Sequence, residues 1–184
     1  MDILFENVSK AYGKPVLENR TLRFPDGKIT ALLGESGLGK TTVLRLIAGL
    51  ESPDAGAVQT NGKIAYLFQE PRLLPALSVW KNVRLAAPSD KAAKEALELC
   101  RAEHFADKYP DTLSGGEKQR TALARLIAFG GDILLLDEPF SALDSETKET
   151  LIQNLSPRFR GKTVVLVTHS EAEAKRLADE TIRL

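Results

Sequence analysis

Residues 29–50 read ITALLGESGLGKTTVLRLIAGL, and within them lies the pattern that decides the fold, G-x-x-x-x-G-K-[ST]. The apolar run at 29–33 comes before the pattern and predicts a buried strand. Apolar residues at helical spacing follow it and predict a helix over 40–50. A strand, a glycine-rich loop and a helix in this order are typical of a phosphate-binding loop. The stretch therefore predicts an α/β fold built around a nucleotide site.

The chemistry of this loop explains its residue types. Gly34, Gly37 and Gly39 allow the backbone to turn tightly and direct N–H groups at phosphate oxygens, where the helix N-terminus adds its dipole. Lys40 supplies a mobile charge to the β- and γ-phosphates, and the Thr41 hydroxyl is placed to hold Mg²⁺. A surface loop that matches the pattern by chance is the alternative, and the flanking strand and helix argue against it.

Composition limits the other function classes. The 184 residues are 43% hydrophobic, which is enough for one domain with a sizeable core. Lys plus Arg and Asp plus Glu number 25 each, so no large basic field favours nucleic acid. No apolar run is long enough to span a membrane, and the acidic N-terminus lacks a signal-peptide pattern, which predicts a soluble cytoplasmic protein. The single cysteine, Cys100, is interpreted as part of the core.

Turn residues and apolar runs divide the chain further. Residues 2–24 predict two strands around the Gly13-Lys14-Pro15 turn, and Asn61-Gly62 predicts a type I′ hairpin between 57–60 and 63–68. The unbroken apolar runs 133–136 and Thr163–Val167 suit strands buried on both faces of a parallel sheet, together with 29–33.

The segment after this predicted hairpin has a different character. Between Pro71 and Asp111 the sequence predicts helices, one capped by Ser78 and another by Ser89 or Asp90. This segment is a candidate helical subdomain.

A second glycine signal follows, Leu113-Ser114-Gly115-Gly116-Glu117. Ser114 and Glu117 have the spacing of a capping box, so a helix is expected to start here. Two glycines at a helix start cost about 1 kcal/mol each relative to alanine, which favours a site that something approaches closely. An anion such as a phosphate is one candidate, and an ordinary capped helix is the alternative.

Charged and polar residues follow two of the predicted strands. Asp137 and Glu138 end the run 133–136, at the edge of the sheet where open α/β folds bind ligands. Asp137 is placed to hold Mg²⁺ and Glu138 to polarise an attacking water, unless the pair is only a solvated strand end. His169 follows Thr163–Val167 at the same edge, either as a catalytic residue or as a structural one.

These motifs resemble, in order and over essentially the whole chain, the ATP-binding cassette (ABC) ATPases. The resemblance implies a P-loop NTPase core with a mostly parallel sheet, an N-terminal antiparallel β subdomain and an inserted helical subdomain at about 71–128, within one domain over 1–184. It implies ATP and Mg²⁺ as ligands. The ATP-binding set is then Tyr12, Gly34, Glu35, Ser36, Gly37, Leu38, Gly39, Lys40, Thr41 and Thr42, with Tyr12 stacking on adenine unless it only packs.

The same resemblance assigns the remaining roles. Gln69 is similar to the Q-loop glutamine, Glu138 to the catalytic carboxylate and His169 to the switch histidine, so the catalytic set is Lys40, Gln69, Glu138 and His169. Thr41, Gln69 and Asp137 are the expected Mg²⁺ ligands. The signature motif, which acts on the ATP of a partner, is Leu113, Ser114, Gly115, Gly116 and Glu117, and the D-loop residues are Ser141 and Asp144.

Family members associate head to tail, so one copy of each motif implies a homodimer or a pair with a similar cassette. The stretch 69–83 is similar to that of bacterial importer ATPases, which implies an integral-membrane permease partner and a peripheral position at the inner face of the cell membrane. Four apolar residues would suit docking or form the subdomain's own small core: Leu73, Leu74, Leu77 and Trp80.

Three rivals remain. A soluble ABC ATPase that acts on nucleic acid or ribosomes usually carries long coiled-coil insertions or two cassettes, and neither is visible here. A P-loop GTPase or kinase does not explain the signature motif. A non-hydrolysing cassette is disfavoured because every expected catalytic position is filled. Thr41 and Glu117 differ from the family's frequent Ser and Gln but keep the needed oxygen, and the helical region is compressed relative to the family.

Overall fold

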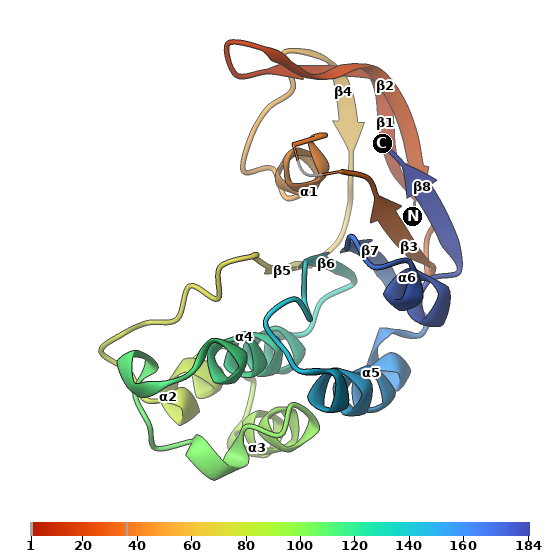
Figure 1. Ribbon diagram of the computed structural model, residues 1–184. Helices are drawn as coiled ribbons and strands as arrows, with labels where there is room; N and C mark the ends of the chain where they lie inside the picture. Colours follow the sequence, from red (N-terminus) through yellow and green to blue (C-terminus); the bar gives the residue numbers. More distant parts are fainter. Residues whose placement is uncertain (1, 36) are drawn as a thin grey trace. The chain divides into compact units, whose positions relative to one another are not determined.

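The computed structural model describes residues 2–35 and 37–184 (Figure 1). The chain divides into two compact units. The first holds the described part of Met1–Tyr66 together with Gly131–Asp137 and Phe159–Leu184, and the second holds Leu67–Gly130 and Glu138–Arg158. The single domain over 1–184 with an insertion at about 71–128 stays a prediction.

An antiparallel sheet of three strands belongs to the first unit (Figure 1). Its order is β2 (Pro15–Phe24), β1 (Ile3–Ala11) and β4 (Ala55–Gln59). The central strand β1 pairs antiparallel with both neighbours, so that Phe5 lies opposite Leu22 on one side and Val58 on the other. The two strands predicted around the Gly13 turn are therefore confirmed.

The hairpin predicted at Asn61-Gly62 is wrong. The strand before it, β4, pairs with β1, whereas the strand after it, β5 (Ile64–Leu67), belongs to the other sheet. A type I′ turn needs positive φ at both central residues, and of this pair only Gly62 has it, at 128°. The Lys63 N–H instead donates to Asp132 Oδ2 at 2.9 Å, which directs the chain to the edge of the parallel sheet.

The parallel sheet has the order β5, β6 (Ile133–Asp137), β7 (Thr163–Val167), β3 (Ile29–Leu33) and β8 (Glu180–Arg183). Every residue of β3, β6 and β7 is buried, as the unbroken apolar runs predict for strands covered on both faces. The register sets Val167 beside Asp137 of β6 and beside Leu32 of β3. The carboxyl ends of these three strands therefore share one edge.

Two helices of this unit pack on β3. The helix that follows the glycine loop, α1 (Lys40–Ile47), buries Val43, Leu44 and Ile47 in a cluster with side chains of both sheets. Near the chain's end, α6 (Glu171–Leu177) buries Ala174 against Ala31 and Leu33. Because alternate residues of a strand point to opposite faces, Leu32 joins the α1 cluster while its neighbours join the α6 cluster.

The second unit is helical, with α2 (Val79–Arg84), α3 (Asp90–Leu99), α4 (Gly115–Phe129) and α5 (Ser145–Phe159), whose last residue belongs to the first unit. Short 3₁₀ turns occur at Glu103–Phe105 and Pro110–Thr112. Helices α2, α3 and α4 pack against one another (Figure 1). The side chains of Ser78 and Ser89 cap α2 and α3, as predicted.

Two further expectations concern this unit and the chain as a whole. Cys100 is fully buried at the end of α3, and burial raises the pKa of its thiol, so its interpretation as part of the core is confirmed. Within the described residues, none of the helices has the length and apolar character needed to span a membrane.

Candidate functional site

The glycine-rich loop between β3 and α1 has the backbone that its sequence requires. Gly34, Gly37 and Gly39 all have positive φ, at 154°, 89° and 87°. A Cβ on Gly39, the N-cap of α1, would lie 2.8 Å from Val16 Cγ1, so a larger residue meets both backbone strain and a close contact there. Ser36, predicted as part of this loop, lies outside the described residues.

Lys40 holds the two ends of this loop together. Its Nζ donates hydrogen bonds to the carbonyl oxygens of Gly34 and Glu35, each at 2.7 Å, and only 8% of the residue is exposed. A buried ammonium needs partners of this kind, because its desolvation is otherwise costly. The loop thus presents a positive charge that can exchange carbonyl oxygens for phosphate oxygens. Two neighbours predicted in the same set differ in exposure, since Leu38 is exposed and Thr42 is buried.

The first residue pair suited to a metal is Thr41 and Asp137. Thr41 Oγ1 donates to Asp137 Oδ2 at 2.9 Å, so the start of α1 and the end of β6 meet at these two oxygens. Among residues 2–35 and 37–184, no group of three or more His, Cys, Asp or Glu side chains could hold a metal. Mg²⁺ does not need such a group, because it is usually held by one or two protein oxygens, substrate phosphates and waters. The hydroxyl and the carboxylate therefore fit the predicted Mg²⁺ position.

His169 and Tyr12 complete the predicted residues of the first unit. His169 is exposed and follows β7 by two residues, at the edge of the sheet that also carries the glycine loop and Asp137. Tyr12 follows β1 and is 51% exposed; its hydroxyl donates to the Glu51 carboxylate, and Lys10 Nζ lies 5.6 Å from its ring centroid. Adenine stacking by Tyr12 stays a prediction.

The predicted catalytic residues of the second unit are Gln69 and Glu138. Glu138 directly follows β6 and has a left-handed backbone, with φ at 50°. The backbone N–H and the Oγ–H of Ser141 both donate to the Glu138 carbonyl, at 3.3 and 3.1 Å, which holds this conformation. Strained backbone of this kind clusters at functional sites. Gln69 is exposed, and the nearby Arg72 guanidinium lies 4.1 Å from the Phe68 ring centroid.

The signature sequence forms the capping box that was predicted. The Ser114 N–H donates to Glu117 Oε2 at 2.8 Å, and the Glu117 N–H donates to Ser114 Oγ at 3.2 Å. The bond from the Ser114 backbone lowers the pKa of Glu117, helped by the Ser114 hydroxyl and by Lys108. A Cβ on Gly115 would meet no atom within 4 Å, so the start of α4 is open to an approaching group. Leu113, just before it, is buried.

The predicted D-loop residues lie after Glu138. Asp144 Oδ1 accepts a hydrogen bond from the Thr147 N–H at 2.9 Å. This bond caps the start of α5 and lowers the pKa of Asp144. A Cβ on Gly116 would lie 3.3 Å from the carbonyl oxygen of Ala142, so the signature helix and the D-loop are neighbours within this unit.

Sequence reasoning missed two polar residues of α4 that hold the loops carrying Gln69 and Glu138. The buried Gln119 side chain donates to the Pro139 carbonyl at 3.0 Å. The Arg125 guanidinium donates to the carbonyls of Pro71 and Arg72, at 2.9 and 3.0 Å, and its burial lowers its pKa. The signal available in the sequence is their spacing, which sets Gln119 and Arg125 among the apolar residues of the helix.

The predicted site residues therefore fall into two sets. In the first unit, β3, β6 and β7 bring to one edge the glycine loop with Lys40 and Thr41, Asp137 and His169. In the second unit, α4 begins at the signature motif and contacts the D-loop and the loops that carry Gln69 and Glu138. Each set has the chemistry of phosphate binding and transfer.

Comparison with known proteins identifies what the chain is similar to. The model of the ABC transporter family matches residues 17–141. An aliphatic sulfonates import ATP-binding protein of Granulibacter bethesdensis is 46% identical over 92% of this chain and 73% of its own length. A probable sulfate/thiosulfate import ATP-binding protein of Chlorella vulgaris is 39% identical over 100% of this chain and 87% of its own length.

Solved structures agree with the family match. A dimeric structure of MJ0796, a bacterial ABC transporter cassette, superposes with a TM-score of 0.92 at 34% identity, covering 99% of this chain and 94% of the other. A second structure of that cassette, in a post-hydrolysis state bound to ADP and phosphate, has the same TM-score at 33% identity, covering 99% of this chain and 94% of the other. The predicted fold class, with a mostly parallel core sheet, an antiparallel sheet and a helical part, is confirmed.

Proposed function

This chain belongs to the ABC transporter family, and from that premise we propose that it hydrolyses ATP to power import of a substrate through a separate membrane subunit. The observation that carries the proposal is the 2.9 Å contact of Thr41 with Asp137, because it joins the phosphate loop to the acidic strand end. The relatives named above are import ATP-binding proteins, which supports import over export.

ATP binding begins at the glycine loop. The N–H groups of Gly34, Gly37 and Gly39 and the N-terminus of α1 take the β- and γ-phosphates. Lys40 gives up the carbonyl oxygens of the loop and donates to phosphate oxygens instead. Tyr12 stacks on the adenine ring, after its own ring turns from Lys10.

The oxygens of Thr41, Asp137 and Gln69 would hold Mg²⁺ beside the phosphates. When bound, this ion neutralises the charge that develops on the transferred phosphoryl group. Asp137 is 1% exposed and its carboxylate accepts the Thr41 hydroxyl at 2.9 Å, which supports one shared position for these two oxygens.

Hydrolysis depends on Glu138 and His169. Glu138 accepts a proton from the water whose oxygen bonds to the γ-phosphorus, while the bond from that phosphorus to the bridging oxygen of ADP breaks. His169 donates a hydrogen bond to the γ-phosphate and keeps it aligned with the water. The hydrogen bonds of Ser141 to the Glu138 carbonyl support this role, because they fix the backbone from which the carboxylate extends.

Each ATP is shared between two cassettes. Ser114 and the N–H groups of Gly115 and Gly116 contact the γ-phosphate held by the glycine loop of a second cassette, either a copy of this chain or a similar one. The open space at Gly115 supports the proposal, since a phosphate can approach that backbone closely. ATP binding then favours the closed dimer and hydrolysis releases it, which moves an attached partner.

The attached partner is an integral-membrane permease, and the chain lies at the inner face of the cell membrane through it. Exposed apolar surface at Leu74, in the loop after Gln69, supports docking there. Equal numbers of acidic and basic residues support a partner other than nucleic acid.

The catalytic part is tested with Glu138→Gln. Removing a positioned base costs about 10²–10⁴-fold in turnover, whereas ATP binding is retained, so an ATP-bound dimer should accumulate. Steady-state phosphate release and size-exclusion chromatography with ATP measure the two effects. Turnover equal to that of the unchanged protein would remove Glu138 from this role.

The transport part is tested by purifying the protein from native membranes with its partners. Recovery of an integral-membrane subunit is expected. Recovery with nucleic acid or ribosomes and without any membrane subunit would instead support a soluble ABC ATPase that acts on those partners.

A further inference from the structure

A closed ring of hydrogen bonds joins residues on both sides of His169 in the sequence. The Thr168 hydroxyl donates to Glu173 Oε2 at 2.7 Å and accepts from the Ser170 N–H at 3.1 Å. The Glu173 N–H donates to Ser170 Oγ at 3.3 Å and closes the ring. His169 is therefore flanked on both sides by residues of one network.

Two members of this ring are polar groups inside the protein. Thr168 is fully buried and Glu173 is 6% exposed, although Glu173 lies in the first turn of α6. A buried hydroxyl and a buried carboxylate are costly unless each has a hydrogen-bond partner. Capping of α6 needs only the bond from the Glu173 backbone to Ser170, so the side-chain bond to Thr168 serves another purpose.

The strand before the ring, β7, is paired on both sides. Val167, the last residue of β7, pairs with Asp137 of β6 and with Leu32 of β3. The chain enters the phosphate loop directly after β3. Thr168 and His169 lie between β7 and Ser170, so their backbone is held at both ends. The backbone that carries His169 is thereby held relative to the phosphate loop.

We propose that Thr168 and Glu173 are positioning residues for His169 in ATP hydrolysis, an inference that rests on the function proposed above. The Thr168 hydroxyl joins the peptide after His169 to the Glu173 carboxylate, which prevents the peptide from rotating. The imidazole then stays where the γ-phosphate needs it. A displacement of about 1 Å at a reacting group can lower a rate by about 10²-fold, so a small shift of His169 on loss of the ring would measurably slow hydrolysis.

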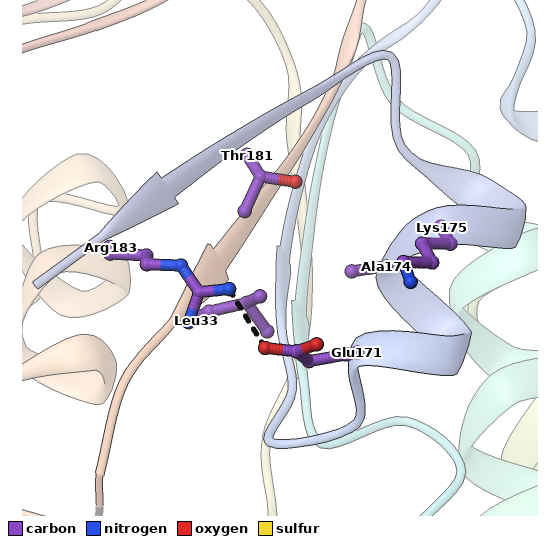
Figure 2. Close-up of a pocket in the computed structure, with 6 residues that line it drawn as sticks. All are labelled: Leu33, Glu171, Ala174, Lys175, Thr181 and Arg183. Carbon is purple, nitrogen blue, oxygen red and sulfur yellow. Dashed lines mark hydrogen bonds and ion pairs between the residues drawn. The ribbon is translucent and has the colours of Figure 1, made fainter.

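The same helix offers a matched control. Glu171 lies two residues before Glu173 and pairs with Arg183 of β8 at 2.8 Å, and both side chains are well exposed. The pair lines a cavity of about 270 Å³ together with Leu33, Ala174, Lys175 and Thr181. Figure 2 shows these side chains and the contact between Glu171 and Arg183. An ion pair that is this exposed contributes little to the stability of the fold. Glu171→Gln therefore removes a carboxylate from the same helix without touching the ring.

The experiment compares Thr168→Val with Thr168→Ser in the full-length protein. Valine keeps the shape of threonine without its hydroxyl, and serine keeps the hydroxyl. We expect Thr168→Val to lower kcat by about 10- to 10²-fold with KM for ATP within about twofold, and Thr168→Ser to restore most of it. Glu171→Gln should leave kcat and KM unchanged.

A double-mutant cycle separates positioning from general stability. In a His169→Ala background, Thr168→Val should have no further effect on single-turnover hydrolysis followed over hours, because its action passes through the histidine. An equal loss in both backgrounds, or an unchanged kcat for Thr168→Val, would overturn the inference. If Thr168→Val does not fold, Glu173→Met takes its place with the same expected losses, because methionine keeps the length of the side chain but has no oxygen to accept the Thr168 bond. Absence of turnover in the unchanged protein would instead overturn the proposed function.

Discussion

The two glycine-rich loops of this chain use glycine for opposite reasons. In the phosphate loop, Gly34, Gly37 and Gly39 have positive φ, and the helix that follows has no side-chain cap. In the signature loop, Gly115 and Gly116 have ordinary helical backbone and a complete capping box. The first loop needs glycine for the shape of its own backbone. The second keeps an open surface, because Gly115 faces no atom within 4 Å of a Cβ.

This contrast explains how the loops can serve one reaction. A backbone that must curl around phosphates is built into the fold, so it can bind nucleotide within a single chain. A regular helix start that leaves space at its N–H groups is instead ready to meet a phosphate brought from outside. Shape in one loop and access in the other are the two properties that a shared ATP site requires. Substitutions in each loop can separate these two properties.

The largest effect is expected from splitting the two loops between chains. Lys40→Ala and Ser114→Arg should each abolish turnover alone, because each homodimer carries the lesion in both sites. Mixing the two should restore activity, since a mixed dimer has one site with both lesions and one with neither. With equal subunits and independent sites, about a quarter of the unchanged rate is expected.

Phosphate release during titration of one variant with the other measures this recovery. Mixing Lys40→Ala with inactive Glu138→Gln is the control, because Glu138 and Lys40 act on the ATP of the same loop, so each site of a mixed dimer carries one lesion and no recovery is expected. No recovery with Ser114→Arg would mean that both sites must act together, and recovery in the control mixture would contradict the assignment of Lys40 and Glu138 to one site.

A large loss of stability is expected from Gly39→Ala. A left-handed backbone costs a residue with a side chain about 1–3 kcal/mol, and the 2.8 Å approach to Val16 adds to this cost. Gly37→Ala is the matched control, because it has nearly the same φ and no atom within 4 Å of the added Cβ. Urea unfolding should order the free energies as unchanged protein, then Gly37→Ala, then Gly39→Ala. Equal stability of the two variants would remove the role of Val16.

The opposite pattern is expected from Gly115→Ala. Alanine is up to about 1 kcal/mol better than glycine in a helix, so stability should stay equal or rise. ATP turnover should fall, because the added methyl group occupies the space in which the partner's phosphate approaches. Thermal unfolding and phosphate release measure the two effects. Turnover that is unchanged would show that no phosphate comes close to this backbone.

Much of this contrast was predictable from local sequence. The pattern around Lys40 predicts the phosphate loop, and the Ser114–Glu117 spacing predicts the capping box, because both depend on residues within one turn. The prediction of a hairpin at Asn61-Gly62 was wrong because β4 pairs with β1, which is distant in sequence.

Buried polar contacts were also missed for the same reason. Arg125 and Gln119 bind backbone carbonyls of loops that lie 20 or more residues away, and no local pattern specifies such partners. The ring of Thr168 and Glu173 is local, yet a short motif does not reveal that its carboxylate turns inward. Tertiary packing decides these contacts.

The smallest effect concerns the pH dependence of the signature loop. The phosphate loop has no such carboxylate cap, because the helix that follows it has no side-chain cap. The Ser114 backbone bond lowers the pKa of Glu117 below its ordinary value of 4.5. The ionised form is therefore bound more tightly in the folded protein, and its contribution is present above the unfolded pKa and lost as pH falls through the folded one. Glu117→Gln keeps an oxygen for the cap but cannot titrate there. The difference in Tm between the unchanged protein and Glu117→Gln should shrink as pH falls from about 6 to about 3. A difference that stays constant over this range would mean that the cap does not depend on the charge of Glu117, and that the signature loop is held by geometry alone.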